Sequence, residues 1–123
     1  MNKAVLLVED NDFIRNMYQL KLAKSNIEVI EAVDGAMALQ KIGEHKPDVV
    51  LLDLMMPNVG GIEVLRELKK QGITPDLPVV VLTNVMDQAT IDEAKKLGAR
   101  DYIVKTDLTP SQVLEKISPF LKK

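Results

Sequence analysis

The stretch Val-Val-Leu-Leu-Asp-Leu-Met-Met-Pro, residues 49–57, decides the fold of this chain of 123 residues. Four apolar residues lead directly into the acid Asp53, and the segment ends at Pro57. A short apolar run bounded by a breaking residue predicts a strand that is buried on both faces. A carboxylate is rarely buried without a partner, so we expect Asp53 where the strand leaves the core. In open α/β sheets, ligands bind at that end of the strands.

Apolar runs and amphipathic stretches alternate five times along the chain. The apolar runs predicted as strands are 4–8, 27–32, 49–53, 79–83 and 102–105. This alternation predicts an α/β fold with a parallel sheet, right-handed crossovers and helices on both faces. The first, third and fourth runs are the most uniformly apolar, so we expect them at the centre of the sheet. The resulting strand order 2-1-3-4-5 is the flavodoxin-like arrangement, a doubly wound (βα)5 sheet in a single domain that spans residues 1–123.

Each predicted strand is followed by a stretch whose apolar residues recur at helical spacing. The first helix can be capped by Asn11 or Asp12, and we expect Phe13, Met17 and Leu20 to face the core. The starts predicted for the other four helices are Asp34-Gly35, Gly61, Asp87 or Thr90, and Thr109-Pro110.

Composition narrows the class of protein. Hydrophobic residues make up 46% of the chain, charged residues 28%, and the net charge is −2, as is typical of soluble globular domains. Basic residues are not clustered, so we expect no direct binding of nucleic acid. The absence of cysteine excludes disulfides, thiolate–zinc sites and thiol catalysis. The first apolar run is too short for a signal peptide, and no run is long enough for a membrane span, so we expect no membrane contact and a cytoplasmic location.

Polar residues follow or end four of the predicted strands. They are Glu9 and Asp10, Asp53, Thr83 and Lys105. Because parallel strands end at one edge of the sheet, we expect these side chains to converge between the first and third strands. Three neighbouring carboxylates repel one another unless a cation lies among them. Oxygen donors select a hard ion, and we expect Mg²⁺, with Mn²⁺ as the alternative.

This set of residues suits phosphoryl transfer, in which positioning and charge neutralisation do most of the catalysis. Ionised Asp53 needs no general base to attack a phosphorus atom in line, and it would become an aspartyl phosphate. Lys105 would offer a positive charge to the phosphoryl oxygens, and Thr83 would offer a hydroxyl donor.

The chain resembles the receiver domain of bacterial two-component response regulators, and it is close in size to single-domain chemotaxis regulators. The segments that carry the resemblance are LLVEDN, LLDLMMP, VVVLTN and DYIVK. The resemblance implies that Asp53 accepts a phosphoryl group from a histidine kinase or a phosphotransfer protein. It also implies that Asp10, Asp53 and the backbone carbonyl of Met55 bind Mg²⁺, with Glu9 acting largely through water. The protein would then be a signalling phosphoacceptor, catalysing only its own phosphorylation and dephosphorylation.

The resemblance further implies a conformational switch at Thr83 and Tyr102. In the family, the threonine moves toward the phosphate and the aromatic ring turns inward. This alters the face formed by the fourth helix, the fifth strand and the fifth helix. A local charge can bias such a two-state element, because Thr83 would bond the phosphate in only one state. The output would pass through a downstream protein target or an output domain that the sequence does not identify.

Two departures from the family pattern concern loops. Thr106 follows Lys105, where the family usually has proline. A cis bond before a residue other than proline costs about 3–4 kcal/mol, so we predict a trans bond and a rearranged loop over 106–108. Gly60-Gly61 stands where an acid followed by glycine is usual, so we expect a more mobile loop there.

A third departure concerns the lifetime of the phosphoryl group. Met55 lies two residues after Asp53, and Val85 lies two residues after Thr83. In the family, these positions tune the attack of water on the phosphate. Both side chains are apolar and cannot orient a water molecule, so we expect slow dephosphorylation.

Three other functions compete with the leading one. An aspartate-nucleophile phosphohydrolase usually carries a second acid two residues after the nucleophile, where this chain has Met55. A flavin-binding module would offer hydroxyls and free N–H groups to a phosphate, whereas Glu9 and Asp10 would repel it. A degenerate receiver, used only as an interaction surface, would have no need of the intact set of acids, threonine and lysine.

Overall fold

Five parallel strands form a single sheet in the order β2-β1-β3-β4-β5, as the sequence predicts. The structure is a computed structural model that describes residues 3–74 and 76–121. The strands are β1 (Lys3–Val8), β2 (Ile27–Ala32), β3 (Val49–Leu52), β4 (Val79–Thr83) and β5 (Asp101–Val104). Their bounds differ from the prediction by at most one residue at each end.

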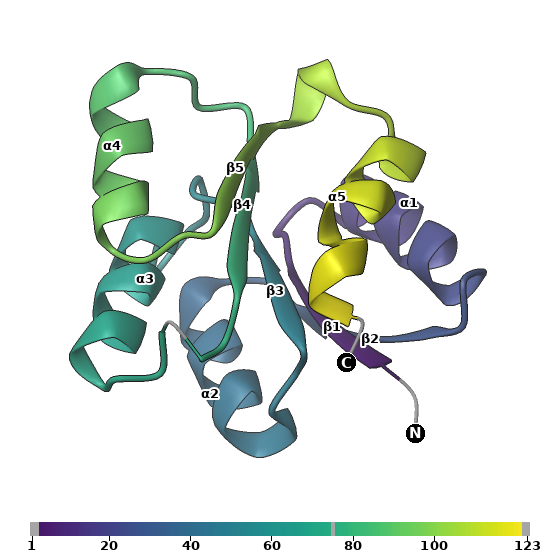
Figure 1. The fold of residues 1–123 in the computed structure, drawn as a ribbon, viewed down its shortest axis with the longest axis horizontal. Helices are drawn as coiled ribbons and strands as arrows, with labels where there is room; N and C mark the ends of the chain where they lie inside the picture. Colours follow the sequence, from purple (N-terminus) through teal and green to yellow (C-terminus); the bar gives the residue numbers. More distant parts are fainter. Residues whose placement is uncertain (1–2, 75, 122–123) are drawn as a thin grey trace.

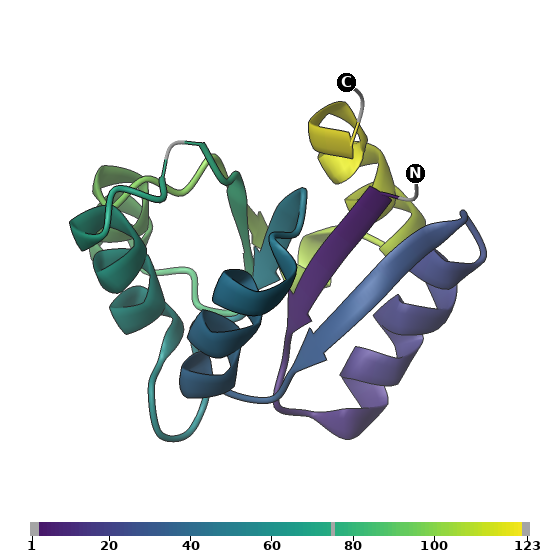
Figure 2. The same ribbon diagram turned by 90° about the horizontal axis from the view of Figure 1, so that it is seen from below.

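Helices cover both faces of the sheet. The helices are α1 (Asp12–Ala23), α2 (Gly35–His45), α3 (Gly61–Lys70), α4 (Gln88–Lys96) and α5 (Pro110–Leu121), and the 3₁₀ helix η1 (Lys105–Asp107) follows β5. Helices α2, α3 and α4 lie on one face of the sheet, and α1 and α5 lie on the other (Figures 1 and 2). The predicted doubly wound α/β fold is confirmed. None of the helices in the described part of the chain is both long enough and apolar enough to span a membrane.

The central strands are continuous apolar runs because each of their faces meets a separate hydrophobic core. In β1, Leu6 and Val8 belong to the core under α2 and α3, whereas Val5 and Leu7 belong to the core under α1 and α5. All four residues of β3 are buried and divide between the two cores in the same way. Burying a single side chain of this kind contributes about 1.5–3 kcal/mol, so the central strands dominate the stability of the domain.

The buried face of α1 differs from the prediction. Phe13, Met17 and Leu20 are 78%, 39% and 59% exposed, so the expectation that they face the core is wrong. The sequence of α1 carries two apolar stripes. The stripe that includes Tyr18 and Leu22 is the one that packs under the sheet.

Arg15 accounts for this choice of face. Its guanidinium donates a hydrogen bond to the carbonyl oxygen of Glu9 at 3.0 Å and lies 3.2 Å from the carboxylate of Glu31. At 100° per residue, Arg15 shares its side of the helix with Tyr18 and Leu22. Hydrophobicity alone does not rank the two stripes, because the helix is rotated so that an arginine meets its polar partners at the sheet edge.

Four of the helices begin at residues with capping side chains, as predicted, whereas α3 follows Gly60 and has no side-chain cap. Asn11, Asp34 and Asp87 each accept a hydrogen bond from the N–H three residues further on, at 2.9, 2.8 and 3.0 Å. At the start of α5, Thr109 and Gln112 bond each other reciprocally, side chain to backbone N–H. Such caps satisfy N–H groups that have no partner within the helix.

Candidate functional site

Four of the predicted site residues meet at the C-terminal edge of the sheet. Glu9 follows β1, Asp53 follows β3, and Lys105 begins η1 directly after β5. Glu9 and Asp53 are only 3% and 5% exposed, whereas Asp10 is exposed. One carboxylate oxygen from each of the three acids lies within 4.8 Å of the other two. The acids come together because β1 and β3 are neighbours that end at the same level of the sheet.

The ammonium group of Lys105 joins two of these carboxylates. Its Nζ contacts Oε1 of Glu9 and lies 3.1 Å from Oδ2 of Asp53. Burial alone would lower the pKa of Lys105, but the hydrogen bonds and the attraction of the two acids outweigh it and leave the pKa raised. The lysine is therefore a fixed positive charge beside Asp53.

Glu9 has an unfavourable environment for a negative charge. Burial raises the pKa of Glu9, and repulsion from Asp53 raises it further. Hydrogen bonds from Lys105 and from the N–H of Asn11, at 3.1 Å, oppose this shift only in part. A further cation near Glu9 would stabilise its ionised form.

The oxygen donors of this acidic cluster fit a hard divalent cation. Two of the three carboxylates are buried, and exposed Asp10 leaves one side open to water. Mg²⁺ is bound in proteins through one or two carboxylates while it keeps several waters, which matches this arrangement of buried and exposed oxygens. The cluster of Glu9, Asp10 and Asp53 is thus suited to Mg²⁺ by its donor chemistry.

The segment after Asp53 is fixed close to it. The N–H of Met55 donates to Oδ1 of Asp53 at 3.2 Å, which orients the carboxylate whose other oxygen meets Lys105. At the start of α3, an added Cβ at Gly61 would lie 2.4 Å from the carbonyl oxygen of Asp53. Only glycine allows the helix to begin this close to the acid.

The two predicted switch residues are joined through Val85, in the loop between β4 and α4. Thr83 is completely buried at the end of β4, and its hydroxyl oxygen accepts the N–H of Val85 at 3.4 Å. The hydroxyl of Tyr102, in β5, donates to the carbonyl oxygen of Val85 at 2.7 Å. Both side chains are thus bonded to one residue of a loop that borders the acidic cluster.

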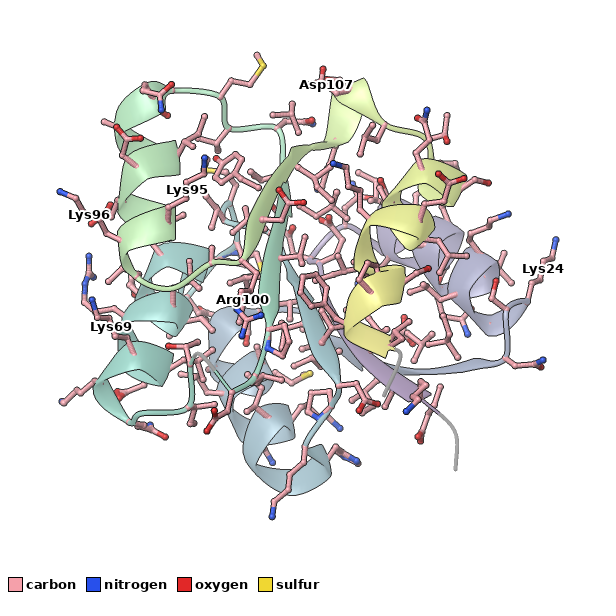
Figure 3. All side chains as sticks on the ribbon, viewed as in Figure 1. Lys24, Lys69, Lys95, Lys96, Arg100 and Asp107 are labelled. Atoms are coloured by element: carbon pink, nitrogen blue, oxygen red, sulfur yellow. The ribbon has the colours of Figure 1, made fainter. Side chains whose placement is uncertain are left out.

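Lysines at the ends of α3 and α4 lie apart from the acidic cluster. Figure 3 shows Lys69 and Lys96 on the outer side of these helices, whereas Asp107, at the end of η1, lies at the edge of the sheet that carries the acids. Nζ of Lys69 donates to the carbonyl oxygen of Lys96 at 3.1 Å, a contact that complements the C-terminal end of α4. These lysines stabilise helix ends, whereas Lys105 belongs to the acidic site.

Sequence reasoning missed Arg15, whose guanidinium holds the backbone of Glu9 from α1. The available signal was an arginine four residues after the cap Asn11, on the side of α1 that carries Tyr18. The position of this arginine points to the site only when the buried face of α1 is known.

Comparisons with known proteins agree with this geometry. The family model of the response regulator receiver domain matches residues 5–118. The chain is 39% identical to chemotaxis protein CheY of Thermotoga maritima, over 99% of this chain and 100% of that protein. It is 35% identical to the alkaline phosphatase synthesis transcriptional regulatory protein PhoP of Bacillus subtilis, over 100% of this chain but only 50% of PhoP.

Solved structures show the same architecture. Chemotaxis protein CheY4 of Vibrio cholerae superposes with a TM-score of 0.88 at 30% identity, covering 98% of this chain and 100% of that chain. A CheY-like receiver domain protein of Methanospirillum hungatei superposes with a TM-score of 0.90 at 26% identity, covering 98% and 94%. With the strand order, the acidic cluster and the matched length all in agreement, the chain belongs to the response regulator receiver domain family.

Proposed function

We propose that the chain is a phosphorylation-controlled signalling switch in which Asp53 is the phosphoacceptor. The phosphoryl donor is a phosphohistidine of a kinase or of a phosphotransfer protein, and the transfer takes place in the cytoplasm. The observation that carries the proposal is the environment of Asp53, a buried carboxylate with Nζ of Lys105 at 3.1 Å and two further acids beside it. Residues 1–123 act as one receiver domain.

The reacting groups balance without a general base. A carboxylate oxygen of Asp53 attacks the phosphorus, an O–P bond forms while the P–N bond to the donor imidazole breaks, and the released imidazole takes up a proton. Lys105 holds a positive charge where the phosphoryl oxygens arrive, and the Thr83 hydroxyl is a donor at the end of the neighbouring strand.

Asp10, Asp53 and the backbone carbonyl of Met55 would hold Mg²⁺, with Glu9 acting through water. The bound ion would supply positive charge that neutralises the carboxylates and the phosphoryl oxygens. Lys105 supplies one such charge beside Asp53. Met55 stands where a phosphohydrolase would need a second acid, so the domain accepts and loses its own phosphoryl group without turning over a substrate.

The contacts of Val85 provide the route from the site to the surface. When the hydroxyl of Thr83 turns toward the phosphoryl group, the N–H of Val85 loses its acceptor. The carbonyl of the same residue anchors Tyr102, so that ring is released together with the loop. The outer face of α4, β5 and α5 then changes, and a downstream protein target reads the change.

The exposed stripe of α1, formed by Phe13, Met17 and Leu20, is the surface that we assign to the phosphodonor protein. The stripe begins at Phe13, in the first turn of α1 and three residues after Asp10 of the acidic cluster. A donor protein that delivers its phosphoryl group to Asp53 would therefore come close to this end of α1. Exposed apolar residues beside a functional site are typical of protein contact surfaces.

The proposed function is tested by incubation with Mg²⁺ and acetyl phosphate, followed by intact-mass measurement. We expect the wild type to gain the mass of one phosphoryl group, and Asp53→Asn to gain none. Glu28→Gln is the matched control, because it removes an exposed acid that is not part of the cluster. A wild type that stays unmodified with acetyl phosphate and with a kinase would leave only the interaction-surface function.

A further inference from the structure

The start of α2 is bonded to the loop that carries Met55. The N–H of Gly35 donates to the carbonyl oxygen of Val59 at 2.9 Å, and Nδ2 of Asn58 donates to Oδ2 of Asp34 at 3.0 Å. We call these four residues the α2–loop clamp. None of them belongs to the acidic cluster, yet they hold the far end of the segment that begins at Asp53.

The backbone at the clamp accepts few alternatives. An added Cβ at Gly35 would lie 2.2 Å from the carbonyl oxygen of Val59, so a side chain there would push the loop away. Asn58 has a φ of 64°, a left-handed conformation that asparagine and glycine adopt more readily than other residues. The sequence therefore meets both requirements of a close approach between α2 and the loop.

Asp34 divides its two carboxylate oxygens between two tasks. Oδ1 caps α2 by accepting the N–H of Met37 at 2.8 Å, and Oδ2 holds Asn58. The hydrogen bond from the N–H of Met37, with that from Asn58, lowers the pKa of Asp34, so the carboxylate is ionised at neutral pH. The rigid end of a helix thus restrains the loop through a charged acceptor.

The other end of the loop is restrained too. The N–H of Gly61 donates to the carbonyl oxygen of Leu54 at 3.2 Å, and Leu54 is buried in the core. Between Leu54 and the clamp, the segment 55–57 has an exposed side chain at Met55. The clamp consequently restrains the Met55 backbone from its C-terminal side.

We propose that Asn58 and Asp34 are positioning residues that set the affinity of the site for its divalent cation, by holding the loop that presents the Met55 carbonyl. This inference rests on the proposed function, because it takes that carbonyl as a ligand of Mg²⁺. Neither residue touches the ion or the reacting atoms. They act by preorganising one ligand, which lowers the conformational cost of binding.

The first test replaces Asn58 with glycine, which keeps the left-handed backbone and removes the amide. Mg²⁺ binding to the unphosphorylated protein is measured by calorimetry, and amide hydrogen exchange of residues 55–61 is measured without metal. For Asn58→Gly we expect the dissociation constant for Mg²⁺ to rise roughly threefold to fivefold, the factor for one modest hydrogen bond, and the loop amides to exchange faster.

Gln40→Ala is the matched control. Nε2 of Gln40 donates to the carboxylate of Glu44 at 3.2 Å. This variant therefore also removes an exposed hydrogen bond between an amide and a carboxylate. Both partners of that bond lie within α2, so the bond does not hold the loop. We expect wild-type Mg²⁺ affinity from this variant. If Asn58→Gly lowers the unfolding free energy without metal but leaves the Mg²⁺ constant equal to that of Gln40→Ala, the clamp is merely structural and the inference is wrong.

A rescue variant separates loss of the hydrogen bond between Asn58 and Asp34 from other effects of a substitution at position 58. Asn58→Asp places two carboxylates against each other and should break the clamp. Adding Asp34→Asn restores a donor and an acceptor in reversed order, at the net charge of the wild type, and keeps an oxygen to cap α2. We expect the dissociation constant of the double variant for Mg²⁺ to return to within about twofold of the wild-type value. A twofold difference corresponds to the free energy of one weak hydrogen bond. A double variant that binds Mg²⁺ as weakly as Asn58→Gly would overturn the clamp.

The acetyl phosphate assay keeps this test distinct from that of the proposed function. If the wild type binds Mg²⁺ and is not phosphorylated, the phosphoacceptor proposal fails while the clamp is still measurable. If the wild type is phosphorylated, the Mg²⁺ concentration that gives half the maximal rate should be higher for Asn58→Gly, with the maximal rate little changed. A lower maximal rate at unchanged Mg²⁺ dependence would contradict a role in positioning the ligand.

Discussion

Lys105 shows how a single residue can stabilise the fold and compete with a ligand. Its ammonium group meets the two buried carboxylates of Glu9 and Asp53. We expect Lys105→Met to lower the unfolding free energy at neutral pH by about 3 kcal/mol, at the low end of the cost of breaking a buried ion pair, because water reaches the rim of the site. The same variant should bind Mg²⁺ more tightly than the wild type and be phosphorylated more slowly. Denaturant unfolding with and without Mg²⁺ measures the first two effects.

The pH dependence of this variant follows from Glu9. Burial raises the pKa of Glu9 above 4.5, and loss of the lysine would raise it further. An acid whose pKa is higher in the folded protein than in the unfolded chain destabilises the folded state when it is ionised. This destabilisation grows as the pH rises from the pKa in the unfolded chain through the pKa in the folded protein. The stability deficit of Lys105→Met should therefore shrink as pH falls toward 4.5. If the loss of unfolding free energy in Lys105→Met grew on acidification, the unpaired carboxylate of Glu9 would not be its cause.

The lifetime of the phosphoryl group is also decided by single residues. The side chains of Met55 and Val85 are both apolar. Neither side chain can orient an attacking water, so we expect the phosphoprotein to decay over minutes or longer and Met55→Asn to decay faster. Mass spectrometry after removal of the donor gives both rates. A wild-type half-life of seconds would rule out this account.

Site residues were predictable from sequence to the extent that strand ends determine them. Glu9, Asp53 and Lys105 each follow an apolar run, and parallel strands bring such positions to one edge. Arg15 and Asn58 were not predictable in this way. Their partners, the carbonyl of Glu9 and the carboxylate of Asp34, lie on other elements, and only the folded geometry brings them within reach.

At the scale of elements, α1 shows what a hydrophobic pattern leaves undecided. Its sequence contains two apolar stripes, and the predicted one is exposed. The ionic contacts of Arg15 turned the helix, so the stripe of Phe13, Met17 and Leu20 faces outward. The strands were easier to predict, because burial on both faces leaves no choice of face to make.

The exposed stripe of α1 gives a prediction that separates two kinds of phosphodonor. We expect Phe13→Ser to slow phosphotransfer from a protein donor at least about fivefold, the factor that corresponds to a loss of about 1 kcal/mol when a large aromatic side chain is truncated within an interface. Phosphorylation by acetyl phosphate, which needs no docking surface, should be unchanged. Parallel time courses with the two donors measure the difference. An equal loss with both donors would mean that the substitution disturbed the acidic cluster instead.

At the scale of the whole molecule, the fold could be predicted because each level of the sequence indicates the same architecture. Alternating strands and helices require crossovers, and the polarity of the second and fifth strands places them at the edges. Covering the sheet on both faces leaves its C-terminal edge as the place where polar side chains gather. Fold and site are thus consequences of one strand arrangement, with β1 and β3 at its centre.

The final prediction follows from this joint origin. The acids of the cluster come from separate strands, so the unfolded chain does not present them together, and Mg²⁺ should bind the folded state preferentially. Above its dissociation constant, each tenfold increase in Mg²⁺ should raise the unfolding free energy by about 1.4 kcal/mol. Urea unfolding at constant ionic strength measures this slope. We expect Asp10→Asn to shift the rise to higher Mg²⁺ concentrations and Glu28→Gln, which removes an exposed acid outside the cluster, to leave it unchanged. A wild type whose stability ignores Mg²⁺ would show that folding does not assemble a metal site from these acids.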